Sequence, residues 1–563
     1  MKYLSTKLLI LYLLFLSAME LLAYHRGGIF SVIASRLWLG TALLCLLLFC
    51  ITALHTFIKD LKNRQWLLLI GFTLLLFLFC SKIGNLGYSD ISFETTLQIT
   101  AGLNSFLSKD LNYTDVAFLD YANRQYVLNA LPALLFGRTV PALHLGFALP
   151  FLIGMTLLFL ELRTRLNQLG LPEKYALLPL YALPVFPYIT EYFMNFEQTL
   201  TPVSFTMMGL ALLLRFYRRR DFPGILSLSF VGGMCCNAYT PVLAFFGFLI
   251  VFLALWGVGT VLQNCKNPAT TAARGNTRWH AALCFALILQ FGCYFAATLV
   301  TRQKEMITTA KQDVSLIGST LSAWLDFFTD NAGHFWGLWL FPVALYLFFS
   351  LTGLLKLPHF LVSVWMLLTV FFSGALAGYT TYDKAHEIQR NMLIIPVFVT
   401  AVFFAAVRYF QQHPIHLPRF VLPCGLLILL LLGQFNFSME HHSFTYYRFV
   451  QPMKYMIAFS RDTLAENQIR NTEEFNLVLL TDNVLLSNLS DYTAFFYPNA
   501  HTYVFRQTES PDGPDLTLPT FVFCERAEFP KEWTGTIFTQ NFTNTRYHST
   551  VTWYCLRAEA SFP

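Results

Sequence analysis

The feature that most constrains the fold of this chain is a series of long apolar stretches. About 13 of them, each near the length that crosses a bilayer, follow one another between residues 7 and 436. Only 12% of all residues are charged, whereas soluble proteins carry roughly 25%. Backbone amide and carbonyl groups within lipid must be hydrogen-bonded inside the protein, so such stretches form helices. The sequence therefore predicts an all-α polytopic membrane protein.

The predicted spans leave short loops between them over most of this region. They are 7–24, 37–57, 65–83, 140–160, 175–190, 199–215, 223–237, 239–262, 280–300, 336–355, 358–378, 391–408 and 418–436. The run from 223 to 262 is broken only at Asn237 to Pro241, and we interpret it as a tight hairpin of two helices. Apart from His144 and Gln290, the span centres are nearly free of ionisable or amide side chains.

Lys and Arg residues gather in alternate loops, which predicts the orientation of the chain. Clusters at 59–64, 163–174 and 215–220 mark cytoplasmic loops, because basic residues in short loops stay on that side. The formal net charge of +6 is explained by these loops and indicates no nucleic-acid partner. We expect a multi-pass protein of the plasma or inner membrane rather than the endoplasmic reticulum. Four segments then lie outside the cytoplasm: 84–139, 302–335, 379–390 and 437–563.

The segment after the third span interrupts the apolar pattern and divides the chain. We expect N-terminal membrane helices over 1–83, an extracytoplasmic loop over 84–139, a membrane core over 140–437 and an outer soluble domain over 438–563. Within the loop, 91–108 and 121–136 show helical spacing with one apolar face. They are too short and polar to span, which is typical of helices lying in the membrane interface.

The outer domain reads as a small α/β or α+β fold. Apolar, β-branched runs at 475–480, 520–524 and 550–555 predict strands. Cys524 and Cys555 lie in two of these runs, and an extracytoplasmic compartment permits a disulfide between them. The sequence leaves open whether they pair.

Carboxylates in the polar loop are the first candidates for chemistry. Asp90 follows a span directly, Glu94 lies one helical turn further on the same face, and Asp120 lies between the two predicted interfacial helices. Acidic side chains near a bilayer are costly unless they face water or a partner. A helix N-cap is the ordinary role for such an Asp; a catalytic base or metal ligand is the alternative.

Basic residues in two other outer segments are candidates for binding an anion. His386 and Arg390 are four residues apart and share a helical face, a spacing that suits a phosphate clamp. Contact with lipid headgroups is the simpler reading of this pair. Arg302 and Lys304 open another outer segment and can steer an anionic ligand. Charges in that position more often anchor the end of a helix.

The order of these parts resembles the GT-C superfamily of membrane glycosyltransferases. The likeness is greatest to the protein O-mannosyltransferase-like branch and the aminoarabinose transferase of lipid A. It rests on Ser89-Asp90 beyond an early span, on the run 133–138 with its Leu-Phe-Gly, and on the acid in Asn195-Phe196-Glu197. A Gly-rich hairpin over 231–239 and the late run 386–396, with its His, Arg and Pro, add to it. The family's Asp-Glu pair is Asp90-Ile91 here, and three spans rather than one precede the acidic loop.

This resemblance implies an inverting transfer of a sugar from a polyprenyl- or dolichyl-phosphate donor. The acceptor hydroxyl belongs to a lipid, glycan or protein at the extracytoplasmic face. Asp90 is then the base that takes the hydroxyl proton, and Arg390, helped by His386, stabilises the leaving phosphate. Glu94 or Asp120 orients the acceptor or binds a divalent cation. The sequence leaves metal dependence open and indicates no other cofactor.

Two other functions remain open. An O-antigen ligase or polymerase also uses outer Arg and His residues with a lipid-linked donor, but it would not need the Asp90 loop. A transporter would be favoured by polar residues inside the spans.

Overall fold

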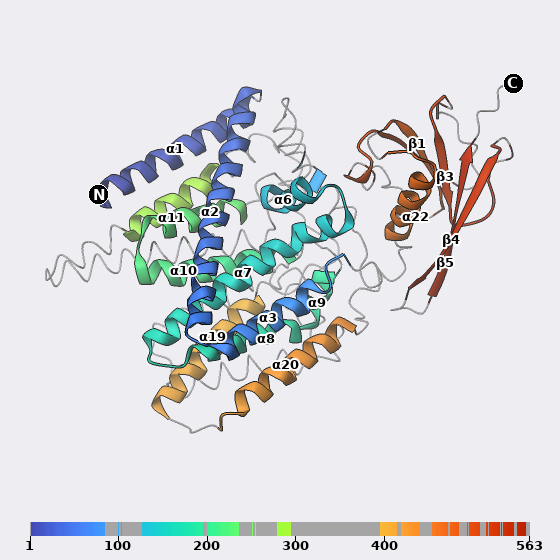
Figure 1. Ribbon diagram of the computed structural model, residues 1–563. Coiled ribbons are helices and arrows are strands. Elements are labelled where there is room, and N and C mark those ends of the chain that lie inside the picture. The colour runs from blue at the N-terminus through green and yellow to red at the C-terminus, as the bar shows by residue number, and fades with distance from the viewer. Residues whose placement is uncertain are drawn as a thin grey trace, which may run out of the picture.

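The computed structural model has a helical part and a separate outer sheet (Figure 1). It describes residues 2–26, 28–84, 99, 100, 103, 126–194, 200–235, 250, 254, 279–293, 394–413, 418–438, 453–470, 473–482 and, with gaps, 493–558. Statements about the structure below refer to these residues.

The helical part is built from elements that follow the predicted apolar stretches. They are α1 (Lys2–Arg26), α2 (Ile29–Lys62), α3 (Trp66–Cys80), α6 (Tyr126–Phe136), α7 (Val140–Gln168), η1 (Glu173–Ala176), α8 (Leu177–Ala182), η2 (Leu183–Val185), α9 (Pro187–Met194), α10 (Leu200–Arg219), α11 (Phe222–Cys235), α19 (Ile394–Gln412) and α20 (Val421–Ser438). A further apolar helix covers Trp279–Cys293.

Four of the described helices are long and apolar enough to cross a membrane: Val32–Lys62 within α2, α7, Ile395–Gln412 within α19, and α20. Shorter apolar helices cover 66–80, 203–216, 222–234 and 279–293. The predicted spans 336–355 and 358–378, and nearly all of 239–262, lie outside the described residues. Helix α11 covers most of the first arm of the predicted hairpin, whose turn at 237–241 is not among the described residues. The number of spans therefore stays a prediction.

One predicted span is wrong as a single helix. The stretch predicted over 175–190 is divided into η1, α8, η2 and α9. Pro184 and Pro187 lie at the breaks, and proline removes a backbone donor and clashes with the preceding turn. Hydropathy alone hides this, because proline interrupts the helix without making the stretch polar. The first two helices, in contrast, extend well beyond their predicted bounds of 7–24 and 37–57.

Helix α7 forms the centre of the helical part. Most of its side chains are buried, and its Phe159 ring stacks on Phe72 of α3 with ring centroids 4.4 Å apart. Phe151, about two turns closer to the start of α7, packs against Phe79 and Phe193. The aromatic contacts join α3, α7 and α9, so the apolar core runs along α7.

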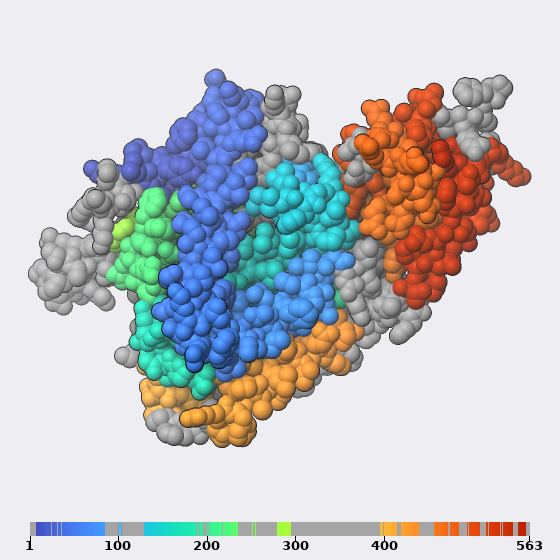
Figure 2. Space-filling model, viewed as in Figure 1, coloured from blue at the N-terminus to red at the C-terminus, as the bar shows by residue number. Residues whose placement is uncertain are grey.

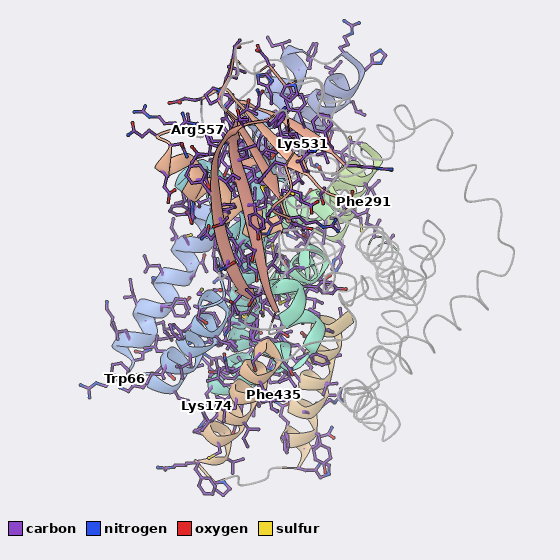
Figure 3. The ribbon with its side chains drawn as sticks, turned by 90° about the vertical axis from the view of Figure 1, so that its right-hand side faces the viewer. Trp66, Lys174, Phe291, Phe435, Lys531 and Arg557 are labelled. Carbon is purple, nitrogen blue, oxygen red and sulfur yellow. The ribbon has the colours of Figure 1, made fainter. Side chains whose placement is uncertain are left out.

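A buried ion pair fixes the C-terminal end of α7. Arg163 forms two hydrogen bonds with Asp60 of α2, of 2.5 and 2.7 Å, and a third of 2.6 Å with Glu173 of η1. The side chains of Arg163 and Asp60 are only 6% and 5% exposed. We call this the inner end. Figure 3 shows Trp66 and Lys174, which lie there, far from Arg557 of the sheet and Lys531 of the outer domain.

The opposite end of the helices, here the outer end, is where α3 finishes, α7 begins and the outer domain lies. Gly84 contacts the first turn of α7, and Lys82 lies 5.5 Å from the Phe437 ring at the end of α20. Which end faces the cytoplasm stays a prediction. Figure 2 shows the outer domain beside α6.

Helix α6 covers part of the second stretch predicted to be an interfacial helix, 121–136, and its apolar side chains are divided between buried and exposed. Leu131 is buried against the helical part, whereas Leu135 and Phe136 are 73% and 64% exposed. Exposed apolar side chains at the end of a short helix suit a position at the edge of the bilayer. Of the first predicted interfacial helix, only Ile99, Thr100 and Leu103 are described, and all three are helical.

The outer domain is a mixed sheet with one described helix, α22 (Met453–Glu466), packed on it. The strands are β1 (Phe475–Leu480), β2 (Ala500–Phe505), β3 (Thr520–Cys524), β4 (Gly535–Asn544) and β5 (Ser549–Ala558), in the order β2-β1-β3-β5-β4. Strand β1 is parallel to β2 and β3, and β5 is antiparallel to β3 and β4. The three predicted strands are confirmed, and β1 and β3, which are buried throughout, form the centre.

Cys524 and Cys555 do not form a disulfide in this sheet. In the register of β3 and β5, Phe523 faces Cys555 and Cys524 faces Tyr554. Neighbouring residues of a strand point to opposite faces, so the two thiols lie on opposite sides of the sheet. Both thiols are buried, and neither is bonded to another cysteine. The open question of their pairing is therefore answered by strand register.

We expect Asp60→Asn to destabilise the protein strongly. The substitution removes a charge from beside Arg163 while that guanidinium stays buried, which costs about 3 kcal/mol of unfolding free energy. Thermal unfolding of the detergent-purified chain measures the effect. Asp462→Asn is the control, because Asp462 and its partner Arg461 are 47% and 66% exposed and such pairs contribute about 0–1 kcal/mol. Equal decreases in the melting temperature of the two variants would show that burial of the ion pair does not increase its contribution to stability.

Glu525, which follows β3, gives a pH-dependent prediction. Its Oε1 is buried with no partner among the described residues, and burial raises the pKa of its carboxyl above the ordinary value of 4.5. The folded protein thus favours the protonated form, so stability falls as pH rises from 4.5 through the folded pKa. We expect Glu525→Gln to raise the melting temperature at pH 7 and to leave it unchanged at pH 4.

The matched control for this prediction is Glu528→Gln, three residues away, where the side chain is exposed. It should change the melting temperature little at either pH. A gain for Glu525→Gln at pH 4 as large as at pH 7 would contradict the titration argument.

Candidate functional site

The residues that the sequence singles out all lie outside the described residues. These are Asp90, Glu94, Asp120, Arg302, Lys304, His386 and Arg390. Their proposed roles stay predictions. The structure does describe the residues that border them, and these residues form a defined site at the outer end.

We call residues 85–125, which contain Asp90, Glu94 and Asp120, the acidic segment. The chain leaves α3 toward this segment through a tightly packed turn. Gly84 has a φ of +74°, a conformation that glycine adopts far more readily than other residues. A Cβ atom at this position would lie 2.8 Å from Pro141 in the first turn of α7. A side chain is therefore excluded by both the backbone conformation and the neighbour. Gly84 is only six positions before Asp90.

His144 binds this turn to two helices. Its Nδ1 accepts a hydrogen bond of 3.0 Å from the Gly84 amide, so its Nε2 donates to the Phe193 carbonyl, 2.7 Å away. This pattern fixes one neutral tautomer. The ring is fully buried. His144, noted in the sequence only as a polar side chain in a span, is thus a structural tie among the end of α3, α7 and α9.

The far end of the acidic segment also rests on the start of α7. A Cβ atom on Gly146 would lie 2.4 Å from the Asn129 carbonyl oxygen of α6 and 2.7 Å from Ile99. Only glycine lets α6 and Ile99 approach α7 so closely. Both borders of the segment are therefore held within two turns of the same helix.

A cleft of about 290 Å³ lies between this region and the outer domain. We call it the outer cleft. Its lining includes Arg138, Thr139 and Pro141 from the α6–α7 junction, and Arg461 and Tyr497 from the outer domain. Pro141 contacts Gly84 on one side and lines the cleft on the other. The acidic segment therefore leaves α3 directly beside the cleft.

Two guanidinium groups make the outer cleft suited to an anion. Arg138 is half-buried and donates a hydrogen bond of 3.0 Å from Nη1 to the Phe495 carbonyl. Burial lowers the pKa of this guanidinium, but arginine keeps its charge at neutral pH. Arg461 is 66% exposed and pairs with Asp462 at 3.2 Å. Both guanidinium groups line the cleft, so both can donate hydrogen bonds to a phosphate that enters it.

Tyr497 completes the wall on the side of the outer domain. Its hydroxyl shares a hydrogen bond of 2.6 Å with Ser460 of α22, and burial raises its pKa to about 12. It is therefore a neutral hydroxyl that holds the cleft's shape rather than a base. Within the described ranges, no three His, Cys, Asp or Glu side chains come together as metal ligands.

No sequence pattern marks Arg138, Arg461 or Tyr497 as a binding residue, although Arg138 ends the run 133–138. A signal for Arg138 was present: it precedes Thr139 and Pro141, an N-cap and a proline in the first turn, which mark the start of a helix. The side chain of Thr139 accepts a hydrogen bond of 3.3 Å from the Ala142 amide. No local pattern connects Arg138 with Arg461, because tertiary packing alone brings them together.

Comparison with known proteins gives a distant likeness to solved structures. No family model and no curated protein matches the chain. A solved structure that is similar in part is the oligosaccharyltransferase of Archaeoglobus fulgidus, crystallised in complex with Zn and sulfate. The identity is 11%, the match covers 82% of this chain and 68% of that one, and the TM-score is 0.42. Values this low do not establish a common function.

We expect His144→Ala to lower the unfolding free energy by about 3 kcal/mol, because the Gly84 amide and the Phe193 carbonyl lose their partner in a buried place. His144→Gln should lose less, since an amide side chain can both accept and donate. Chemical denaturation of the purified chain measures both variants. His413→Ala, at an exposed histidine after α19, is the control and should leave stability unchanged. Equal loss from alanine and glutamine would argue for packing instead of hydrogen bonding.

Proposed function

We propose that this chain is a membrane glycosyltransferase of GT-C type. It moves a sugar from a polyprenyl- or dolichyl-phosphate donor to an acceptor hydroxyl at the extracytoplasmic face. The observation that carries the proposal is the position of Gly84, which contacts Pro141 at the wall of the outer cleft. The chain from Gly84 to Asp90 spans at most about 20 Å, so the acidic segment starts within reach of two arginines.

The position of α19, the helix that follows His386 and Arg390 in the sequence, supports a site at the outer end. The C-terminal end of α19 lies at the inner end, where Gln411 donates to the Leu169 carbonyl at 3.1 Å. Its first residue, Ile394, is thus at the other end of a helix about 27 Å long. Arg390 and His386 precede Ile394 by only a few residues. In this proposal the acidic and basic candidates therefore act at the same end of the protein.

In this proposal one residue acts as the base and two others bind the leaving phosphate. Asp90 takes the proton of the acceptor hydroxyl as its oxygen attacks the anomeric carbon. The bond to the donor phosphate breaks on the opposite face of the sugar, which inverts the anomeric centre. Arg390 and His386 stabilise the charge that develops on this phosphate. Glu94 or Asp120 orients the acceptor or binds a divalent cation.

The donor is an anion with a long apolar tail, and these two parts bind in different places. The tail lies between spans in the bilayer. Arg302 and Lys304 attract the phosphate from a distance, and Arg138 in the outer cleft offers a further, half-buried cation.

One observation favours the transporter alternative. Glu20 of α1 is fully buried within a predicted span, and a buried carboxylate in a membrane segment is often functional. A transporter, however, would not need an acidic segment beside the outer cleft. An O-antigen ligase or polymerase would use the basic residues without Asp90. Substitution of Asp90 therefore separates the three possibilities.

We expect Asp90→Asn to reduce sugar transfer by about 10²–10⁴-fold, because the amide keeps the shape but accepts no proton. The assay follows release of polyprenyl phosphate from polyprenyl-phosphate mannose, glucose and aminoarabinose, with host membrane extract as the source of acceptor. Asp115→Asn, in the same segment and without an assigned role, is the matched control.

Arg390→Lys tests the phosphate half of the same mechanism. Lysine keeps the charge but loses the planar fork of donors, so both turnover and apparent donor affinity should fall. Activity near wild type for Asp90→Asn would return Asp90 to the role of a helix cap. A silent Arg390→Lys would assign that residue to lipid headgroups.

A further inference from the structure

A second cavity lies at the inner end, away from the outer cleft. Its volume is about 150 Å³, and α2, α7, α10 and α11 form its walls. The walls are mainly apolar and include Leu46, Leu157, Met208 and Phe230. Leu48 on the α2 wall is 37% exposed, so part of this wall faces the surroundings of the helical part. We call it the inner cavity.

The inner cavity is polar at one end only. Thr52 of α2, Glu161 of α7 and Arg215 of α10 lie where these helices approach the inner end, whereas Ala42 and Met234 line the deep end. The ten residues from Thr52 back to Ala42 correspond to about 15 Å of helix. That is half of the roughly 30 Å hydrocarbon core of a bilayer, or the depth of one leaflet.

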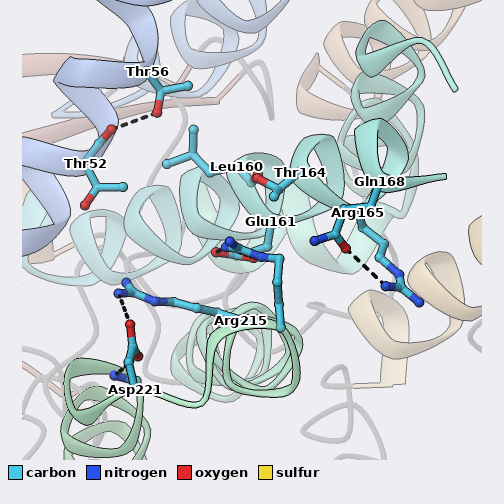
Figure 4. Close-up of polar contacts among 11 residues, drawn as sticks. Thr52, Thr56, Leu160, Glu161, Thr164, Arg165, Gln168, Arg215 and Asp221 are labelled. Atoms are coloured by element: carbon cyan, nitrogen blue, oxygen red, sulfur yellow. Dashed lines mark hydrogen bonds and ion pairs between the residues drawn. The ribbon is translucent and has the colours of Figure 1, made fainter. Parts of the chain in front are cut away.

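The polar end carries excess positive charge. The run 215–220 contributes Arg215, Arg218, Arg219 and Arg220, and the carboxylates beside it are Glu161 and Asp221. Figure 4 shows Glu161 above α10 and the Arg215 side chain extended toward Asp221.

These two carboxylates already have partners. Glu161 pairs with Arg218 at 2.7 Å, and Asp221 accepts a 3.0 Å hydrogen bond from the Gly224 amide at the start of α11. The contact of Arg215 Nη2 with Asp221 is long, at 3.4 Å. Arg215 is thus the only cation that lines the cavity among the described residues, and its contact with the Asp221 carboxylate is long.

We propose that the inner cavity binds one anionic phospholipid of the adjacent leaflet, with an acyl chain along the apolar walls and the phosphate at Arg215. An apolar channel one leaflet deep that ends in a cation matches the two parts of such a lipid. Guanidinium binds phosphate oxygens through two parallel hydrogen bonds. The site joins α2 to α10 and α11, and it is independent of the proposed transfer reaction at the outer end.

Native mass spectrometry of the full-length protein, released from detergent micelles, tests the proposal. The probes are phosphatidylglycerol and phosphatidylcholine with identical acyl chains, titrated separately. We expect at least one phosphatidylglycerol to bind more tightly than phosphatidylcholine. Arg215→Gln should weaken phosphatidylglycerol binding by about tenfold, the worth of one charge-assisted contact. It should leave phosphatidylcholine binding unchanged.

Two further variants separate the cavity from general surface charge. Arg219→Gln is the matched control, because Arg219 belongs to the same basic run but is exposed and does not line the cavity. Its effect should stay below twofold. Ser227→Phe fills the cavity from α11 and should abolish the tight site while the arginines remain. Monodisperse elution of each variant confirms that it is folded.

Three results would overturn the proposal. Equal affinity for the two lipids would remove the role of the headgroup charge. An equal loss from Arg215→Gln and Arg219→Gln would assign binding to the basic surface as a whole. Unchanged binding by a well-folded Ser227→Phe variant would show that the acyl chain does not enter the cavity.

Discussion

Helix α7 is held at both ends by buried polar side chains, and the arrangement of the other helices depends on these two contacts. His144 ties its first turns to α3 and α9, and Arg163 ties its last turns to α2 and η1. The two residues are 19 positions apart, or about 28 Å of helix, close to the roughly 30 Å of a bilayer core. Polar groups that lipid cannot satisfy thus mark both borders of the membrane region.

Between these two borders the packing is apolar and aromatic. Phe72 and Phe159 stack beside the inner end, and Phe79, Phe151 and Phe193 meet nearer the outer end. Such contacts are short-ranged and weakly directional, so on their own they would allow α7 to slide or rotate against α3. The hydrogen bonds of His144 and Arg163 select one register. Pro141 lines the outer cleft and lies within one turn of His144 in α7. The hydrogen bonds of His144 therefore also fix the position of this wall of the cleft.

The sequence allowed prediction of what depends on local pattern. The runs at 475–480 and 520–524 became strands β1 and β3, and the apolar stretches coincide with helices over most of the described chain. Contacts between distant residues were not predictable. Asp60 and Arg163 are 103 positions apart, and Gly84 and His144 are 60. Strand register, which separates Cys524 from Cys555, is likewise set by pairing and not by composition.

The same limits apply to the candidate site. Asp90 and Arg390 could be chosen from the sequence, because a charge beside an apolar stretch is visible locally. The outer cleft could not, since Arg138 and Arg461 come from separate domains. Pro184 and Pro187 show that local pattern also fails where a single residue type breaks a helix that hydropathy describes as continuous.

The packing of Gly84 and α6 on one helix has a consequence for mutations at the start of α7. Gly84 and Asn129, which lie on either side of the acidic segment in the sequence, both pack against the first turns of α7. One short stretch of helix therefore sets the distance between these two borders. A substitution that displaces the start of α7 would move both borders together, however far it lies from them in the sequence.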